Sequence, residues 1–120
     1  MAKQTFMGGG SYTYDEQIVG TWIDGKPIYQ KTVNCGALPN TTQKNVNHGI
    51  ANIDQYVSVF GIFYDTSGTG ESAMMPFATP NSKDNVGVWT KDKSTIALNT
   101  GSDRTSFSAC VTLQYTKTTD

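Results

Sequence analysis

The sequence predicts an all-β fold: an antiparallel two-sheet β-sandwich, jelly-roll-like, of about eight strands, with a barrel as the alternative. Three observations predict it. A β-hairpin signal lies within residues 19–33, short strand-like segments recur roughly every ten residues, and the composition favours strands and turns, with abundant threonine and asparagine and 12 glycines. No helical segment is expected between the strands, which favours antiparallel pairing.

The hairpin signal is centred on Asp24 and Gly25, which lie between two strand-like segments. An Asp-Gly pair fits a two-residue type I′ turn, whose central residues both have positive φ. Because Pro27 has no backbone N–H, the second arm is expected either to lie at a sheet edge or to begin only after this proline. Trp22 is expected to have a structural role and to cover Tyr29 on the partner arm.

Seven segments from residue 28 onward have strand character. Residues 55–64 carry apolar side chains on both faces and are predicted to form a central strand. Residues 108–117 are predicted to lie inside a sheet, although they are close to the C-terminus. The expected strands are 28–35, 43–50, 55–64, 72–77, 86–91, 94–99 and 108–117, with turns at 65–70, 92–93 and 100–105.

The chain is expected to consist of an arm and one domain. Residues 1–11 include Gly8-Gly9-Gly10 and are predicted to be a flexible Gly-rich arm, because three glycines lose much entropy on ordering. Residues 12–120 are predicted to form a β-sandwich knob domain that needs no metal or disulfide to fold. Cys35 and Cys110 lie in alternating strand patterns and are expected to be free thiols.

Charge and hydropathy argue against two classes of partner. Charged residues make up 16% of the chain and the net charge is -1, so there is no basic stripe for nucleic acid and no attraction to a membrane surface. No apolar run approaches the ~18 to 20 residues of a membrane span, and the first residues lack the apolar core of a signal peptide. The chain is therefore expected to be made in the cytoplasm without membrane insertion.

No motif predicts catalysis, a cofactor or a metal. His48 is the single histidine. We expect it to have a structural hydrogen-bonding role, with a metal site shared by three copies as the alternative. Asp15-Glu16 and the loop carboxylates show no pairing suited to glycoside hydrolysis. The serines lack a nucleophile elbow, and residues 65–70 lack the lysine of a phosphate-binding loop. The chain is therefore predicted not to be an enzyme.

Binding remains as the class of function. Sugar recognition combines flat aromatic rings with amide and carboxylate side chains. Trp89, just before the turn at 92–93, is the first candidate, and a position filling one end of the core is the alternative. Tyr64, Asp65 and Asn81 are further candidates because they lie in or beside expected loops.

Five short motifs follow one another along the chain: EQIVG at 16–20, TWIDGKPIYQKT at 21–32, NVNHGI at 45–50, NID at 52–54 and VTLQYTK at 111–117. The second is the most specific, because Trp, Asp-Gly and Lys-Pro coincide in it. In this order, the motifs resemble a module of bacteriophage appendages, found in tail-fibre and head-fibre components of phages and prophages of gut bacteria. The resemblance covers residues 12–117.

The resemblance implies a non-catalytic β-sandwich knob, often a homotrimer, that is assembled in the bacterial cytoplasm and located on the virion. The expected role is attachment to a host surface polysaccharide or to another virion protein. Three weak sites on one rigid tip would bind a repeating polymer far more tightly than one site. A virion-stabilising decoration protein and a carbohydrate-binding module of a secreted bacterial protein are the alternative functions.

Overall fold

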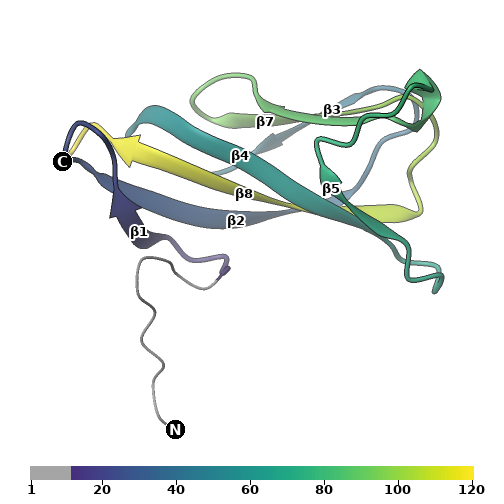
Figure 1. Ribbon diagram of the computed structural model, residues 1–120, viewed down its shortest axis with the longest axis horizontal. Helices are drawn as coiled ribbons and strands as arrows, with labels where there is room; N and C mark the ends of the chain where they lie inside the picture. Colours follow the sequence, from purple (N-terminus) through teal and green to yellow (C-terminus); the bar gives the residue numbers. More distant parts are fainter. Residues whose placement is uncertain (1–11) are drawn as a thin grey trace, which may run out of the picture.

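The computed structural model describes residues 12–120 and consists almost entirely of β-strands (Figure 1). The strands form two antiparallel sheets, so the predicted all-β sandwich of about eight strands is confirmed. The elements are β1 (Gln17–Thr21), β2 (Pro27–Ala37), β3 (Gln43–Asn47), β4 (Ile53–Asp65), β5 (Ser72–Met75), the 3-10 helix η1 (Ser82–Asp84), β6 (Val86–Thr90), β7 (Thr95–Thr100) and β8 (Phe107–Lys117). The predicted arm, residues 1–11, lies outside the described residues.

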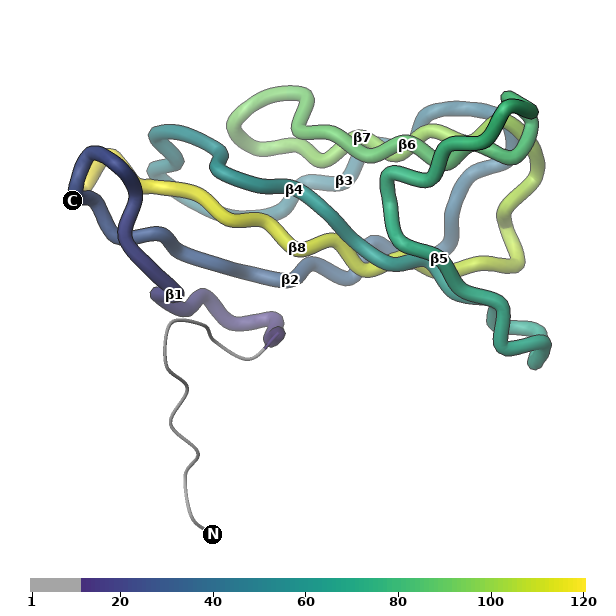
Figure 2. The backbone as a smooth tube through the Cα atoms, viewed as in Figure 1, coloured from purple at the N-terminus to yellow at the C-terminus, as the bar shows by residue number. Residues whose placement is uncertain are grey.

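The two sheets differ in size. The larger has the strand order β1-β2-β8-β4-β5, and the smaller has the order β3-β7-β6. Figure 2 shows the smaller sheet running along one side of the long strands β2, β8 and β4. The strand β8 lies between β2 and β4, at the centre of the larger sheet. The prediction of a C-terminal strand inside a sheet is therefore confirmed. The strand predicted to be central over 55–64 pairs with β8 along its length, but β5 pairs with its other side only at 61–64.

The core lies between the sheets. Alternate residues of β8 point inward and are completely buried, as are the inward residues of β7. Burial of each large apolar side chain contributes about 1.5–3 kcal/mol, which makes the shared core the main source of stability. The completely buried apolar residues that point inward from these two strands are Ala109, Val111, Leu113, Tyr115, Ile96 and Leu98.

The hairpin is confirmed, but its turn differs from the predicted type I′. The N–H of Gly25 donates to the carbonyl of Trp22 at 2.9 Å, and the N–H of Trp22 donates to the carbonyl of Lys26 at 2.8 Å. Gly25 has a φ of 89°, whereas Asp24 does not have positive φ. This is the pattern of a three-residue loop that ends in a left-handed glycine. The Asp24 carboxylate accepts the Lys26 N–H at 3.0 Å and stabilises this arrangement.

Pro27 is the first residue of β2, which lies between β1 and β8 and is not an edge strand. Pairing with β8 begins at Tyr29, so the missing N–H of Pro27 removes no hydrogen bond to β8. The ring of Tyr29 stacks on Tyr115, with centroids 6.0 Å apart and planes at 12°. The aromatic partner of Tyr29 is therefore Tyr115 and not the predicted Trp22, which is half-buried in the turn.

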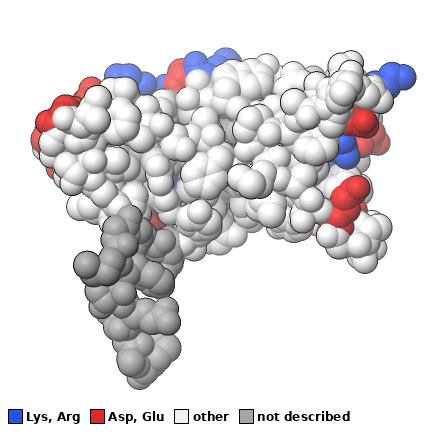
Figure 3. All heavy atoms as spheres, viewed as in Figure 1, with Lys and Arg blue, Asp and Glu red and all other residues white. Residues whose placement is uncertain are grey.

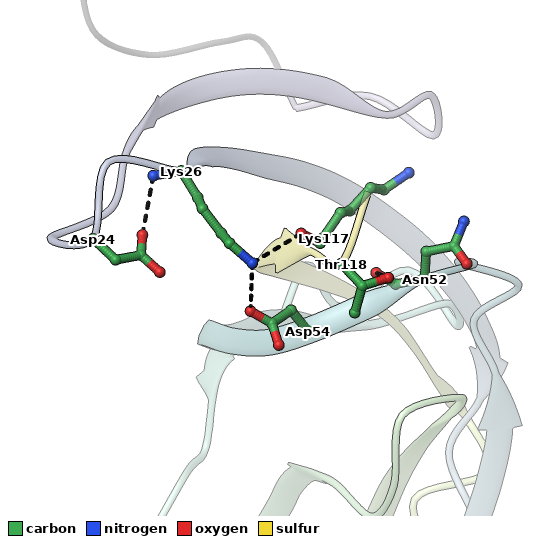
Figure 4. Close-up of polar contacts among 6 residues, drawn as sticks. All are labelled: Asp24, Lys26, Asn52, Asp54, Lys117 and Thr118. Carbon is green, nitrogen blue, oxygen red and sulfur yellow. Dashed lines mark hydrogen bonds and ion pairs between the residues drawn. The ribbon is translucent and has the colours of Figure 1, made fainter. Parts of the chain in front are cut away.

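The Lys-Pro motif links the hairpin to the centre of the larger sheet (Figure 4). The Lys26 ammonium lies 2.9 Å from Asp54 Oδ2 and donates to the carbonyl of Lys117 at 3.3 Å. The interaction with Lys26 lowers the pKa of the Asp54 carboxyl. Both side chains of the ion pair are partly exposed, so screening by solvent keeps its contribution to stability small.

Both cysteines are free thiols, as predicted. Cys35 is buried in the core, and burial raises the pKa of its thiol to about 11. Cys110 pairs with Asn34 and with Ile62 in the register of the larger sheet. It therefore lies on the opposite face of that sheet, away from the core.

Candidate binding surfaces

His48 has the structural role that was predicted from the sequence. Its side chain is buried. Its Nδ1 accepts the N–H of Ile50 at 3.0 Å, so the neutral ring carries its proton on Nε2, 2.8 Å from the Tyr56 hydroxyl. That hydroxyl donates to the carbonyl of Asp92 at 2.7 Å. Both ring nitrogens are therefore engaged in hydrogen bonds within the fold.

The stability of the fold is expected to fall as the pH drops below about 6.5, because burial lowers the pKa of His48 below the value it has in the unfolded chain. Lys31 lowers this pKa further, whereas Asp92 opposes the shift. The unfolded chain then binds a proton that the folded chain does not bind until a lower pH. The midpoint of urea unfolding, measured from pH 7.5 to pH 5, would show this. In His48→Gln the same pH range should have a much smaller effect; an unchanged slope in that variant would contradict the assignment.

Two of the four predicted ligand-binding residues organise turns. Asp65 Oδ2 accepts hydrogen bonds from the N–H and hydroxyl of Ser67 and of Thr69, at 2.7–3.1 Å. These donors hold the pKa of the Asp65 carboxyl well below its usual range. Asn81 caps η1, because its Oδ1 accepts the N–H of Lys83 at 3.1 Å. The local turn geometry accounts for both residues.

Within residues 12–120, no three His, Cys, Asp or Glu side chains are close enough to hold a metal ion. The part of the chain that the structure describes also contains no helix long and apolar enough to cross a membrane.

Trp89 lies on the outer face of the smaller sheet, with 39% of its surface exposed. Its neighbours in β6, Val86 and Val88, point inward and are buried, so the alternation of the strand directs Trp89 toward solvent. Trp89 therefore does not fill one end of the core, which was the alternative position.

Side-chain amides from two other strands share this outer face with Trp89. Trp89 pairs with Ala97, which pairs with Asn45; the adjacent row is Gly87, Asn99 and Gln43. Residues paired across strands point to the same face, and all three amide side chains are exposed. We call this group the Trp89 surface: Gln43, Asn45, Gly87, Trp89, Ala97 and Asn99.

A second surface lies on the outer face of the larger sheet. Its cross-strand rows bring together Thr32, Thr112 and Phe60, and then Cys110, Ile62 and Met74. A hollow of about 440 Å³ is formed there, and Tyr12 closes one side of it with an edge-to-face contact to Phe60 at 6.2 Å. We call this group the outer sheet face: Tyr12, Tyr14, Thr32, Phe60, Ile62, Tyr64, Met74, Cys110 and Thr112.

The outer sheet face is apolar and uncharged. Met74 is 67% exposed and Ile62 is 44% exposed, and neither cross-strand row contains a charged residue. In the view of Figure 3, few charged side chains appear in the middle of the molecule, and most gather at its ends and along its upper margin. Large exposed apolar side chains that lie together are typical of contact surfaces.

Comparisons with protein-family models, curated proteins and solved structures found no match to this chain.

The four predicted ligand-binding residues do not form one site. Tyr64 and Asp65 are neighbours at the end of β4, and Tyr64 belongs to the outer sheet face. Trp89 lies on the other sheet and Asn81 caps η1. The sequence reasoning missed the amides around Trp89, because only the order β3-β7-β6 brings Gln43 and Asn45 beside a residue more than forty positions away. It also missed Ile62 and Met74, whose apolar character alone suggested burial.

Proposed function

We propose that the chain is a non-enzymatic attachment domain of a bacteriophage appendage, of the tail-fibre or head-fibre type, located on the virion. The uncharged and apolar outer sheet face is the observation that carries this proposal, since such a surface is suited to contact with another protein. His48 and Asp65, by contrast, are used in hydrogen bonds that hold the fold together. The motif order over residues 12–117 adds the phage context.

We infer that the outer sheet face contacts the same face of other copies of the chain, in a homotrimer. In a symmetric assembly, side chains near the axis lie close to their own copies, so a charge there would face a like charge. The absence of charge from the two central rows therefore favours self-association over a partner of opposite charge.

The outer sheet face is somewhat smaller than a standard interface. The strands β2 and β8 have 11 residues each, β4 has 13 and β5 has 4. With about 3.3 Å per residue and about 4.8 Å between strands, they cover on the order of 600 Å². Standard protein interfaces bury about 800 Å² per partner. Gln30, Thr32 and Thr112 are already buried within the chain, so an interface on this face would be made mainly by the exposed side chains of Tyr12, Tyr14, Ile62, Tyr64 and Met74.

The purified full-length chain is expected to have a mass in solution three times the 13.0 kDa of one chain. Light scattering coupled to gel filtration measures this mass directly. Attachment is tested separately: the labelled chain should sediment with cells or cell-wall material of gut bacteria and release no sugar from it. A single-chain mass at micromolar concentration would contradict the trimer. Binding to capsid or fibre subunits without binding to cells would instead favour a decoration protein.

A further inference from the structure

The Trp89 surface combines a supported aromatic ring with three exposed amide side chains, and its Ala97 is fully buried. If Gly87 carried a Cβ atom, that atom would lie 3.8 Å from Cζ3 of Trp89. The indole therefore lies against a position without a side chain. Its ring is supported on one side by β6 and is 39% exposed to solvent. Such a supported ring can stack on the C–H face of a sugar without first losing conformational freedom.

The amides beside the ring supply donors and acceptors without charge. Gln43 Nε2 donates to Asn45 Oδ1 at 2.8 Å, which fixes the two side chains relative to each other. This leaves Gln43 Oε1 as an acceptor and the Asn45 amide nitrogen as a donor, and Asn99, which pairs with Gln43, adds a third amide. Sugar hydroxyls both donate and accept, so they match this set.

The composition of the surface selects a class of ligand. Neither row of the Trp89 surface contains a charged residue, and the nearest cation along the chain is Lys91, two residues after Trp89. The polar contacts within the two rows therefore come from amides rather than from the cation that a phosphate or sulfate group would require. A purely apolar ligand would cover the amides without offering them partners, which costs free energy. We propose that the Trp89 surface binds a neutral, hydroxyl-rich glycan. This inference rests on the proposed attachment function and names its receptor class.

The position of the surface agrees with that role. The outer faces of two stacked sheets point in opposite directions. An assembly through the outer sheet face would therefore leave the Trp89 surface of every copy free, and several copies would bind a repeating polysaccharide with avidity.

The test uses the full-length chain and a panel of purified neutral polysaccharides (a glucan, a mannan and a galactan) with one anionic polysaccharide. Affinity gel electrophoresis measures binding, and Trp fluorescence is followed in a Trp22→Phe background so that Trp89 alone reports. We expect a neutral polysaccharide to retard the chain and to shift the Trp89 emission, with little dependence on salt. Trp89→Ala should weaken this binding by at least tenfold, and Asn45→Ala by several-fold.

Three controls keep the result interpretable. Melting temperatures identify loss of folding, and Trp89→Phe retains an aromatic ring and should keep part of the binding. Lys91→Ala should bind like the parent chain.

Undiminished binding by Trp89→Ala, or binding only to the anionic polysaccharide, would overturn the inference. If the parent chain sediments with cells and Trp89→Ala does so equally, the glycan site is wrong while the attachment function stands; if the parent chain does not bind cells, the attachment function itself fails.

Discussion

Replacing Gly61 with alanine is expected to destabilise the fold by about 3 kcal/mol or more, at the upper end of the usual cost of overpacking. Gly61 lies in β4, opposite Val111 of β8 and Met75 of β5. A Cβ atom at this position would lie 2.4 Å from the carbonyl oxygen of Cys110 and 2.8 Å from the Met75 side chain. Met75 can move, but the Cys110 carbonyl belongs to the central strand. The strands would have to separate where the sheet is most completely buried.

Urea unfolding followed by circular dichroism measures this change in free energy. A loss of about 3 kcal/mol is a large part of the 5–15 kcal/mol typical of a domain, so the midpoint of urea unfolding is expected at a clearly lower urea concentration in Gly61→Ala. Gly20→Ala is the matched control, because its Cβ would have only an ordinary contact, 3.8 Å from Ile28 Cδ1. Equal stability of Gly61→Ala and the parent chain would show that the packing around β4 is looser than described.

Introducing a charge into the outer sheet face is expected to dissociate the proposed trimer into single chains. Met74 is 67% exposed within one chain, so Met74→Glu should fold normally. In the assembly, the carboxylate would be buried without a partner and would lie near its own copies, which costs several kcal/mol per buried charge. Sedimentation velocity should show the mass falling from three chains to one, with an unchanged far-ultraviolet spectrum.

The control for this change is Ile23→Glu, because Ile23 is 91% exposed and lies in the hairpin loop, away from the outer sheet face. It adds the same charge and removes a comparable apolar side chain. A trimer that survives Met74→Glu would exclude the outer sheet face as its interface. Dissociation by Ile23→Glu as well would point to a general effect of charge.

The sequence predicted the fold because strand patterns are local. The alternation over residues 28–35 places Gln30, Thr32 and Asn34 on one side of the strand, and their pairing with Gln114, Thr112 and Cys110 confirms this division. The local pattern did not reveal that Gln30 and Thr32 are buried although they lie on the outer side. The backbone of the segment before β1 approaches there, as the hydrogen bond from Thr32 N–H to the carbonyl of Thr13 shows.

The candidate site was less predictable, because it depends on which strands become neighbours. Trp89 was identified from its residue type, but its exposure follows from the direction in which Val86 and Val88 point. The type of the hairpin turn was predicted wrongly for a different reason. The Asp24 carboxylate accepts the backbone N–H of Lys26 within the turn, which favours a three-residue loop over the type I′ turn that the Asp-Gly pair suggests. The spacing of apolar residues along the sequence does not predict hydrogen bonds of this kind.

The central position of β8 affects how the chain can fold during its synthesis. The long strands β2 and β4 do not pair with each other; each pairs with β8, which the ribosome makes last of the eight. Until residue 117 has emerged, the larger sheet lacks the strand that joins its two halves, and long unpaired strand edges are prone to aggregate. A nascent chain halted before residue 107 should therefore depend on chaperones, and production of the protein should be sensitive to events that truncate translation.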